Sequence, residues 1–150
     1  MIRPALAALA LFAVSLAAEA QTYQGRELTD VQLVANTTAV VSGKPFKVGL
    51  LLHMVPGWHT YWKFPGDAGI PTEMKWSLPN EWKIGELQWP IPLKIDEPGD
   101  ILIYGYHDEV LLTQEITPPA ALAGSSVKLT AEASWLVCEK ICIPGSKTLT

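Results

Sequence analysis

The chain has 150 residues, with 11 basic and 15 acidic side chains and a formal net charge of −4 at pH 7. Acids and bases are interspersed, and this mildly negative balance argues against nucleic acid and against anionic membrane surfaces as partners. The length suits one domain with its own core, and 6 tryptophans and 12 prolines favour a β-rich domain with many turns over a helical one.

The N-terminus has the pattern of a cleaved secretory signal peptide, which we place at residues 1–20. A positive charge precedes an almost unbroken apolar run, 5–18, and Ala18-Glu19-Ala20 has the small-x-small form of a signal-peptidase site. We therefore expect Gln21 to begin the mature domain, 21–150. Export places this domain outside the cytoplasm, where disulfides can persist. No later stretch is long and apolar enough to suggest a membrane span.

Short segments in the mature chain alternate apolar and polar residues, with glycine, proline, asparagine and aspartate between them. This is the signature of strands and turns, and the spacing predicts an antiparallel β-sandwich. The predicted strands are Thr29–Ala35, Phe46–Met54, Thr72–Leu78, Trp82–Trp89, Ile101–Tyr106, Val110–Ile116, Val127–Trp135 and Ile143–Leu149. No window has a helical stripe of useful length.

Two long connections rich in proline and glycine, Val55–Pro71 and Pro90–Asp100, are predicted between strands. Long loops in a compact domain are often functional. The first contains an aromatic cluster that includes Tyr61, Trp62 and Phe64. These side chains are expected to fill a small core at one end of the sandwich. They could instead form a docking surface, a lid over the cysteines or a platform for a sugar.

The second connection ends in the acidic turn Asp96-Glu97-Pro98-Gly99-Asp100. Such a run is usually a solvated loop, although Asp96 and Glu97 could also steer a basic partner or lie over the cysteines. Tyr104 and Tyr106 are expected at the end of a strand with their hydroxyls bonded locally. Our candidate cap or docking residues are therefore Tyr61, Trp62, Phe64, Asp96, Glu97, Tyr104 and Tyr106.

The only two cysteines, Cys138 and Cys142, are separated by three residues and are followed by a Pro-Gly stop. They could cycle between dithiol and disulfide, or they could form a permanent bridge. A disulfide across so short a loop stabilises the fold by roughly 2 kcal/mol in the chain-entropy model. Exchange, by contrast, requires a second sulfur close enough to resolve a mixed disulfide. The spacing therefore favours redox exchange over a structural bridge.

Metal binding is a third possibility, because two cysteine ligands could be completed by histidine or methionine. The nearby candidates are His53, Met54, His59 and His107, and copper favours such soft and imidazole ligands. The spacing matches no zinc pattern. We therefore expect structural histidines, no metal and no cofactor other than the cysteine pair.

With these residues in view, the chain resembles the N-terminal periplasmic domain of the thiol:disulfide interchange protein DsbD, and in particular the divergent branch of suppressor-of-copper-sensitivity reductases. The resemblance covers nearly all of the mature chain. The matching stretches are Gly57-Trp58-His59-Thr60-Tyr61-Trp62, Pro65-Gly66-Asp67-Ala68-Gly69, Trp89-Pro90-Ile91-Pro92, Tyr104-Gly105-Tyr106 and the segment from Cys138 to Gly145.

This resemblance implies an immunoglobulin-like sandwich in the periplasm that acts as a thiol–disulfide oxidoreductase. Its electron donor would be a thioredoxin-like domain of a DsbD-type reductase. Its acceptors would be a periplasmic disulfide isomerase or a thiol protein of cytochrome c maturation. The resemblance assigns exchange with partners to Cys142 and the resolving role to Cys138. It also implies a cap over the sulfurs, for which Ile95–Asp100 and Tyr61–Gly69 are the candidates.

The chain departs from well-known members in two respects. They separate the cysteines by five residues, and their cap carries an aromatic residue beside the acids, where this chain has Pro98-Gly99. The last residues, 146–150, alternate like the start of a strand that nothing terminates. We therefore expect either a piece of a longer protein, with membrane attachment only through a C-terminal region that is missing here, or a stand-alone module that needs a separate electron donor. The alternative from another class is a secreted binding module with a structural hairpin disulfide.

Overall fold

The computed structural model describes residues 22–122 and 126–150, and their regular secondary structure consists of strands. The strands are β1 (Thr22–Tyr23), β2 (Arg26–Glu27), β3 (Thr29–Ala35), β4 (Phe46–Met54), β5 (His59–Gly66), β6 (Glu73–Ser77), β7 (Lys83–Ile84), β8 (Leu93–Glu97), β9 (Ile101–His107), β10 (Glu109–Thr117), β11 (Thr130–Cys138) and β12 (Cys142–Leu149). The expected signal peptide, 1–20, lies outside the described residues. Within the described ranges there is no helix of the length and apolarity that crossing a bilayer requires.

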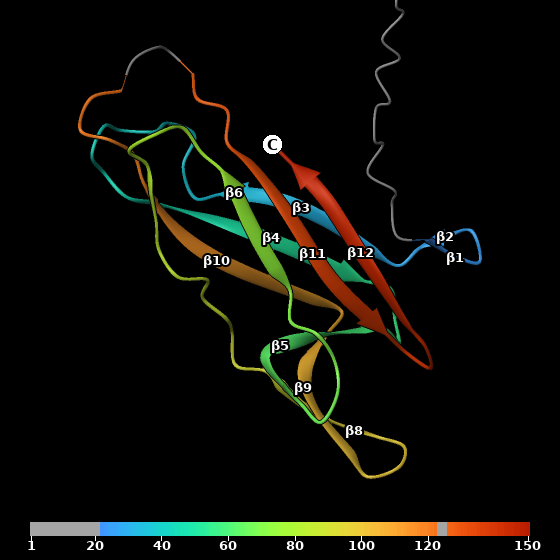
Figure 1. Ribbon diagram of the computed structural model, residues 1–150. Coiled ribbons are helices and arrows are strands. Elements are labelled where there is room, and N and C mark those ends of the chain that lie inside the picture. The colour runs from blue at the N-terminus through green and yellow to red at the C-terminus, as the bar shows by residue number, and fades with distance from the viewer. Residues whose placement is uncertain (1–21, 123–125) are drawn as a thin grey trace, which may run out of the picture.

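The strands form an immunoglobulin-like antiparallel sandwich, which confirms the predicted fold class (Figure 1). One sheet has the order β3-β4-β10-β7. The other has the order β12-β11-β5-β9-β8, and β6 also pairs with β11. The small β1–β2 hairpin is separate from both sheets.

The main core lies between β4 and β10 of one sheet and β11 of the other. Alternating side chains of each strand point inward, as the period of a half-buried strand requires. Leu50, Leu52 and Leu112 are fully buried in this core, together with Val137 of β11. Burial of each such side chain stabilises the fold by about 1.5–3 kcal/mol. The apolar alternation that is visible in the sequence is therefore also the source of the core.

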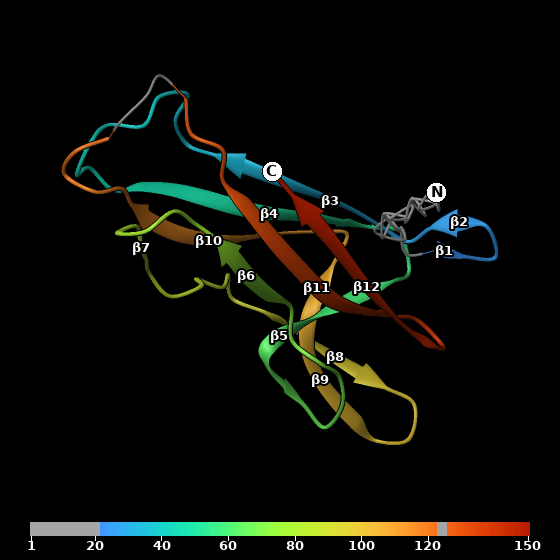
Figure 2. The same cartoon turned by 45° about the horizontal axis from the view of Figure 1, so that its top comes forward.

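One edge of β11 is shared between two neighbouring strands. Thr130–Ser134 pairs with β6, whereas Cys138 pairs with His59 at the start of β5. Because β5 takes over only at the end of β11, the strands β5, β9 and β8 extend beyond the sandwich on the side of the β11–β12 turn (Figures 1 and 2). This arrangement places side chains of β5, β9 and β8 near the cysteines.

Both long connections predicted from the sequence contain a strand, so that part of the prediction is wrong. The segment Val55–Pro71 includes β5, which pairs with β9 at His59–Tyr61 and again at Gly66, with an irregular stretch between. The segment Pro90–Asp100 includes β8, which pairs with β9 along its whole length. Proline and glycine flank both strands, and the long-range pairing with β9 outweighs those local signals.

Two predicted strands differ from the structure by more than one residue at an end. Within Trp82–Trp89 only β7, with two residues, and one isolated bridge from Gln88 to Thr113 are present. The strand predicted as Val127–Trp135 begins at Thr130 and continues to Cys138. The second difference matters for the site, because it places Cys138 in the sheet rather than in the loop that follows it.

Candidate functional site

The two cysteines face each other across a tight hairpin. Cys138 ends β11, Cys142 begins β12, and the two are direct cross-strand partners joined by a disulfide. The backbone N–H of Glu139 donates to the carbonyl of Ile141 at 3.1 Å and closes the turn. The two cysteines differ in access, because Cys138 is 2% exposed whereas Cys142 is exposed to solvent. An attacking thiolate from another protein can therefore reach Cys142 and not Cys138.

A row of four residues crosses the sheet at this level. Cys142 pairs with Cys138, Cys138 with His59, and His59 with His107. Laterally paired residues project from the same face of a sheet, and the two imidazole rings are in contact, with centroids 5.6 Å apart. The pairing therefore places a buried histidine beside the disulfide, on the adjacent strand.

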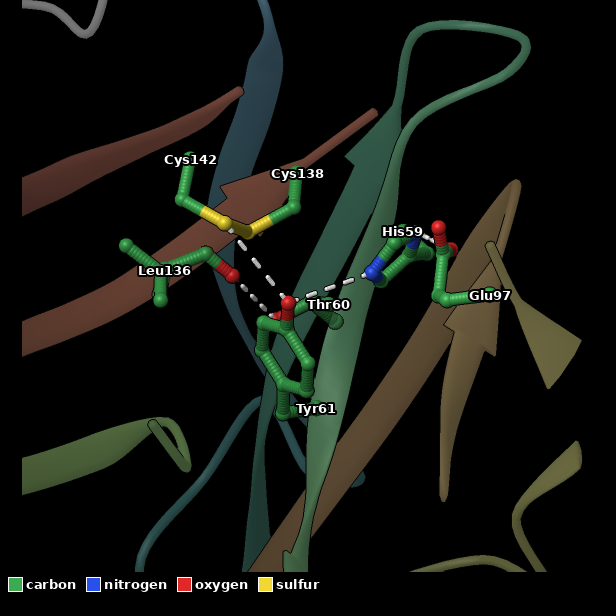
Figure 3. Close-up of a disulfide and its surroundings, with 7 residues drawn as sticks. All are labelled: His59, Thr60, Tyr61, Glu97, Leu136, Cys138 and Cys142. Atoms are coloured by element: carbon green, nitrogen blue, oxygen red, sulfur yellow. Dashed lines mark hydrogen bonds and ion pairs between the residues drawn. A yellow bond between two sulfur atoms is a disulfide. The ribbon is translucent and has the colours of Figure 1, made fainter. Parts of the chain in front are cut away.

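Tyr61 lies two residues after His59 and points to the same face, with its hydroxyl between the imidazole and the disulfide (Figure 3). The Tyr61 hydroxyl is 3.8 Å from Sγ of Cys142 and 3.3 Å from Nε2 of His59. The hydroxyl has one hydrogen, so it can donate to the sulfur or to the imidazole, but not to both. Burial, and secondarily the charge of Glu97, raise the pKa of Tyr61, which keeps this hydroxyl neutral.

Glu97 approaches the other side of the same imidazole from the end of β8. Its Oε1 is 3.9 Å from Nδ1 of His59 (Figure 3), and its side chain is 29% exposed. Burial lowers the pKa of His59; the carboxylate of Glu97 opposes this effect, and the neighbouring ring of His107 adds to it. Burial is the largest of these causes, so the ring is mainly neutral near pH 7.

A cleft of about 400 Å³ opens beside the disulfide. It is lined by both candidate cap segments, by the turn between the cysteines and by apolar side chains of β9. The lining residues are His59, Tyr61, Ala68, Glu97, Pro98, Ile101, Ile103, Cys138, Glu139, Lys140 and Cys142. Ile101 in this cleft and Ile141 in the hairpin turn are exposed apolar side chains. The cleft therefore has an apolar rim close to the accessible sulfur.

Of the seven predicted cap or docking residues, only Tyr61 and Glu97 line this cleft. Asp96 makes an ion pair with Lys94 at 3.1 Å and does not reach it. Trp62, Phe64 and Tyr104 form a separate aromatic cluster, in which the ring of Trp62 contacts both others.

Tyr106 faces the main core, where its hydroxyl donates to the carbonyl of Pro90 at 2.8 Å. Burial raises its pKa to about 12. The Tyr106 hydroxyl is therefore bonded, but to a residue 16 positions earlier in the chain rather than locally.

Sequence reasoning treated His59 as a structural histidine and did not include it in the site. The signal that could have found it is the spacing of His59 and Tyr61, which share a face if this segment is a strand. Ile103 was also missed, because it reaches the cleft only through the pairing of β9 with its neighbours β5 and β8. In the described part of the chain, no group of three or more His, Cys, Asp or Glu side chains is arranged to hold a metal ion.

Comparison with known proteins agrees with this geometry. The family model "Thiol:disulfide interchange protein DsbD, N-terminal" matches residues 29–150. Among solved structures, the N-terminal periplasmic domain of ScsB from Proteus mirabilis is similar, with a TM-score of 0.63 and 26% sequence identity. The similar region covers 85% of this chain and 47% of that chain, so this chain spans about half the length of that structure. No curated protein matches.

Proposed function

The chain belongs to the family of DsbD N-terminal domains, and on this premise we propose that it is a periplasmic module that exchanges its Cys138–Cys142 disulfide with thiol proteins. The observation that carries the proposal is the difference in access between the two sulfurs. One cysteine is exposed at a cleft and its partner is 2% exposed. A permanent bridge has no need of this asymmetry, whereas exchange with another protein uses it. The similar ScsB domain is described as periplasmic, in agreement with the expected export.

Reduction of the module begins when a donor thiolate attacks Sγ of Cys142. The Cys138–Cys142 bond breaks, a mixed disulfide forms at Cys142, and Cys138 leaves as a thiolate that takes up a proton. The second thiol of the donor then loses its proton and attacks the donor sulfur of the mixed disulfide. Cys142 is released, and two electrons have passed to the module.

Delivery to an acceptor is the reverse sequence. The Cys142 thiolate attacks the acceptor disulfide, and one acceptor sulfur leaves as a thiolate. Cys138 then attacks Cys142, which restores the internal disulfide and releases the second acceptor thiolate. Since the cysteines are direct cross-strand partners, Cys138 is already in place for this resolving step.

The donor in this proposal is a thioredoxin-like domain of a DsbD-type reductase, and the acceptors are a disulfide isomerase or a thiol protein of cytochrome c maturation. The apolar rim at Ile101 and Ile141 suits a protein surface that must be desolvated around the reacting sulfurs. We propose that the end of β8 and the turn that follows it form the cap, because Glu97 and Pro98 line the cleft. Ala68, from the other candidate segment, also lines the cleft.

Single-cysteine variants test this proposal. Reduced Cys138→Ser should accumulate a mixed disulfide with an oxidised thioredoxin-like protein, because the module has no second thiol to resolve it. Reduced Cys142→Ser should form little or none, because Cys138 is buried. The adducts are measured by mass spectrometry under non-reducing conditions. The proposal is wrong if both variants behave alike, or if the wild-type disulfide resists reduction in glutathione buffers across the physiological range.

A further inference from the structure

Exchange at Cys142 requires a place for its proton, and the side chains next to the sulfur form a continuous path. The path runs from Sγ of Cys142 to the Tyr61 hydroxyl at 3.8 Å, and from there to Nε2 of His59 at 3.3 Å. It ends at Oε1 of Glu97, which is 3.9 Å from Nδ1 of the same ring. These three links join four side chains in series, and Figure 3 shows Tyr61, His59 and Glu97 leading away from the disulfide in that order.

We propose that His59, acting through the Tyr61 hydroxyl, accepts the proton of the Cys142 thiol when that sulfur attacks and returns it when the sulfur leaves. This inference rests on the proposed function, in which Cys142 is the exchanging sulfur. His59 does not touch the sulfur, so its role is to position and protonate through Tyr61. Glu97 supports that role from the far side of the ring.

The transfer is balanced without a net charge on Tyr61. In the thiol state, the S–H of Cys142 donates to the Tyr61 oxygen, and the Tyr61 O–H donates to Nε2 of neutral His59. Both hydrogens then move along the path, so that the Tyr61 O–H donates to the thiolate and Nε2–H donates to the Tyr61 oxygen. The ring becomes an imidazolium whose Nδ1–H faces the carboxylate of Glu97. The thiol has lost one proton and His59 has gained it.

The surroundings of His59 suit this task. The ring is 2% exposed, so its protonation is governed by its neighbours rather than by bulk water. Burial lowers its pKa, and a neutral ring is available to accept a proton near pH 7. The groups that face it are Glu97 from β8, His107 from β9, Tyr61 on its own strand and the disulfide from β11 and β12. Of these groups, Glu97 supplies the carboxylate whose charge raises the proton affinity of the ring.

A second histidine–carboxylate pair in the described part of the chain is exposed instead of buried. His53 and Glu109 are 3.0 Å apart on the opposite sheet, with side chains 43% and 57% exposed. That pair lies on the sheet without the cysteines, so it provides control substitutions for the histidine and the carboxylate of the path.

The test is the pH profile of alkylation of Cys142 by iodoacetamide in the reduced protein, followed site by site by peptide mapping. Only the thiolate reacts, so the profile reports the proton affinity of the sulfur. His59→Phe and Tyr61→Phe should each shift the Cys142 profile to higher pH and reduce its rate near pH 7 about tenfold, which corresponds to about one pKa unit. Glu97→Gln should shift it in the same direction by a smaller amount. His53→Gln and Glu109→Gln should leave it unchanged.

Superimposable profiles for the wild type, Tyr61→Phe and Glu97→Gln would overturn the proposal, even if the buried His59→Phe substitution prevents folding. Equal shifts in the His53 and Glu109 controls would overturn it as well. The assay needs no protein partner, so its outcome is separate from that of the exchange experiment. Normal exchange with unshifted profiles would remove the role of His59 alone. Shifted profiles without exchange would keep the proton path and remove the proposed function.

Discussion

Gly69 lies against the ring of Tyr61 so closely that a β-carbon at Gly69 would overlap Cε1 and Cδ1 of the tyrosine. Gly69 also has a φ of +105°, a backbone conformation that side chains disfavour. Gly69, which follows β5, therefore restricts the position of the Tyr61 ring, whose hydroxyl contacts Cys142. Gly69 and Tyr61 are eight positions apart in the sequence, and the observed position of the tyrosine ring requires a residue without a side chain at position 69.

Substitution of Gly69 by alanine should lower the free energy of unfolding by two separable amounts. The positive φ costs about 1–2 kcal/mol for a residue with a β-carbon, and the forced displacement of Tyr61 costs about 1–3 kcal/mol more. Gly57→Ala is the matched control, because Gly57 has a φ of +90° and no atom within 4 Å of its β-carbon position. Urea denaturation should show a larger loss for Gly69→Ala. Equal losses would mean that Tyr61 adapts without cost.

Reduction of the disulfide should leave the fold intact. The closed loop is so short that the bond contributes at most about 2 kcal/mol in the chain-entropy model. The urea midpoints of the oxidised protein, the reduced protein and the Cys138→Ser/Cys142→Ser double variant measure this contribution. The reduced protein and the double variant should remain folded with similar midpoints. Unfolding on reduction would instead favour the alternative of a structural bridge.

Stability should fall in mild acid because of His59. Burial holds the pKa of His59 in the folded state below its ordinary value of 6.5, so the unfolded chain binds more protons as the pH falls below about 6.5. The free energy of unfolding therefore decreases with falling pH until the folded-state pKa is passed. His59→Phe should reduce this slope, because it removes the titrating imidazole. Urea denaturation over a series of pH values gives both slopes, and identical slopes in wild type and His59→Phe would contradict the expectation.

Thr60 should help to hold β5 against β11. Its hydroxyl donates to the carbonyl of Leu136 at 3.1 Å, at a place where the ladder between these strands has only the Cys138–His59 pair. Thr60→Val should cost about 1–3 kcal/mol, because it leaves a carbonyl without its donor. Faster hydrogen exchange at the start of β5 should accompany the loss. Thr130→Val, which removes a hydroxyl contact to Thr150 at an exposed position, should cost less than 0.5 kcal/mol, as is typical of surface substitutions.

The sandwich could be predicted from the sequence because its core strands alternate clearly. Phe46–Met54 has the same bounds in the structure as in the prediction, and Val110–Ile116 falls within β10. In both, every second residue is buried and forms the face that packs on the core. The β5 strand was missed because proline, glycine and polar residues interrupt its pattern, and β8 because it is short and lies between prolines. Their strand conformation depends on pairing with β9, which no local signal encodes.

The candidate site was predicted in part for the same reason. The cysteine pair is local in sequence, so its proximity followed from spacing alone. His59, Tyr61 and Glu97 meet the cysteines only because β5 pairs with the last residue of β11 and β8 pairs with β9. Glu97 and Tyr61 were nevertheless among the predicted cap or docking residues, whereas the adjacent Asp96 points to an ion pair elsewhere. Neighbours on a strand face opposite sides, and without the strand the choice between them could not be made.

The eight cross-strand pairs of β11 and β12 set the alignment of the two cysteines independently of the bond between them. Opening and closing that bond is therefore expected to leave the outline of the hairpin nearly constant. A protein that docks here would meet almost the same contour in either oxidation state. Whether an encounter leads to exchange would then depend on the oxidation state of the exposed sulfur of Cys142. The oxidised and reduced forms of the module would compete for the same docking partners.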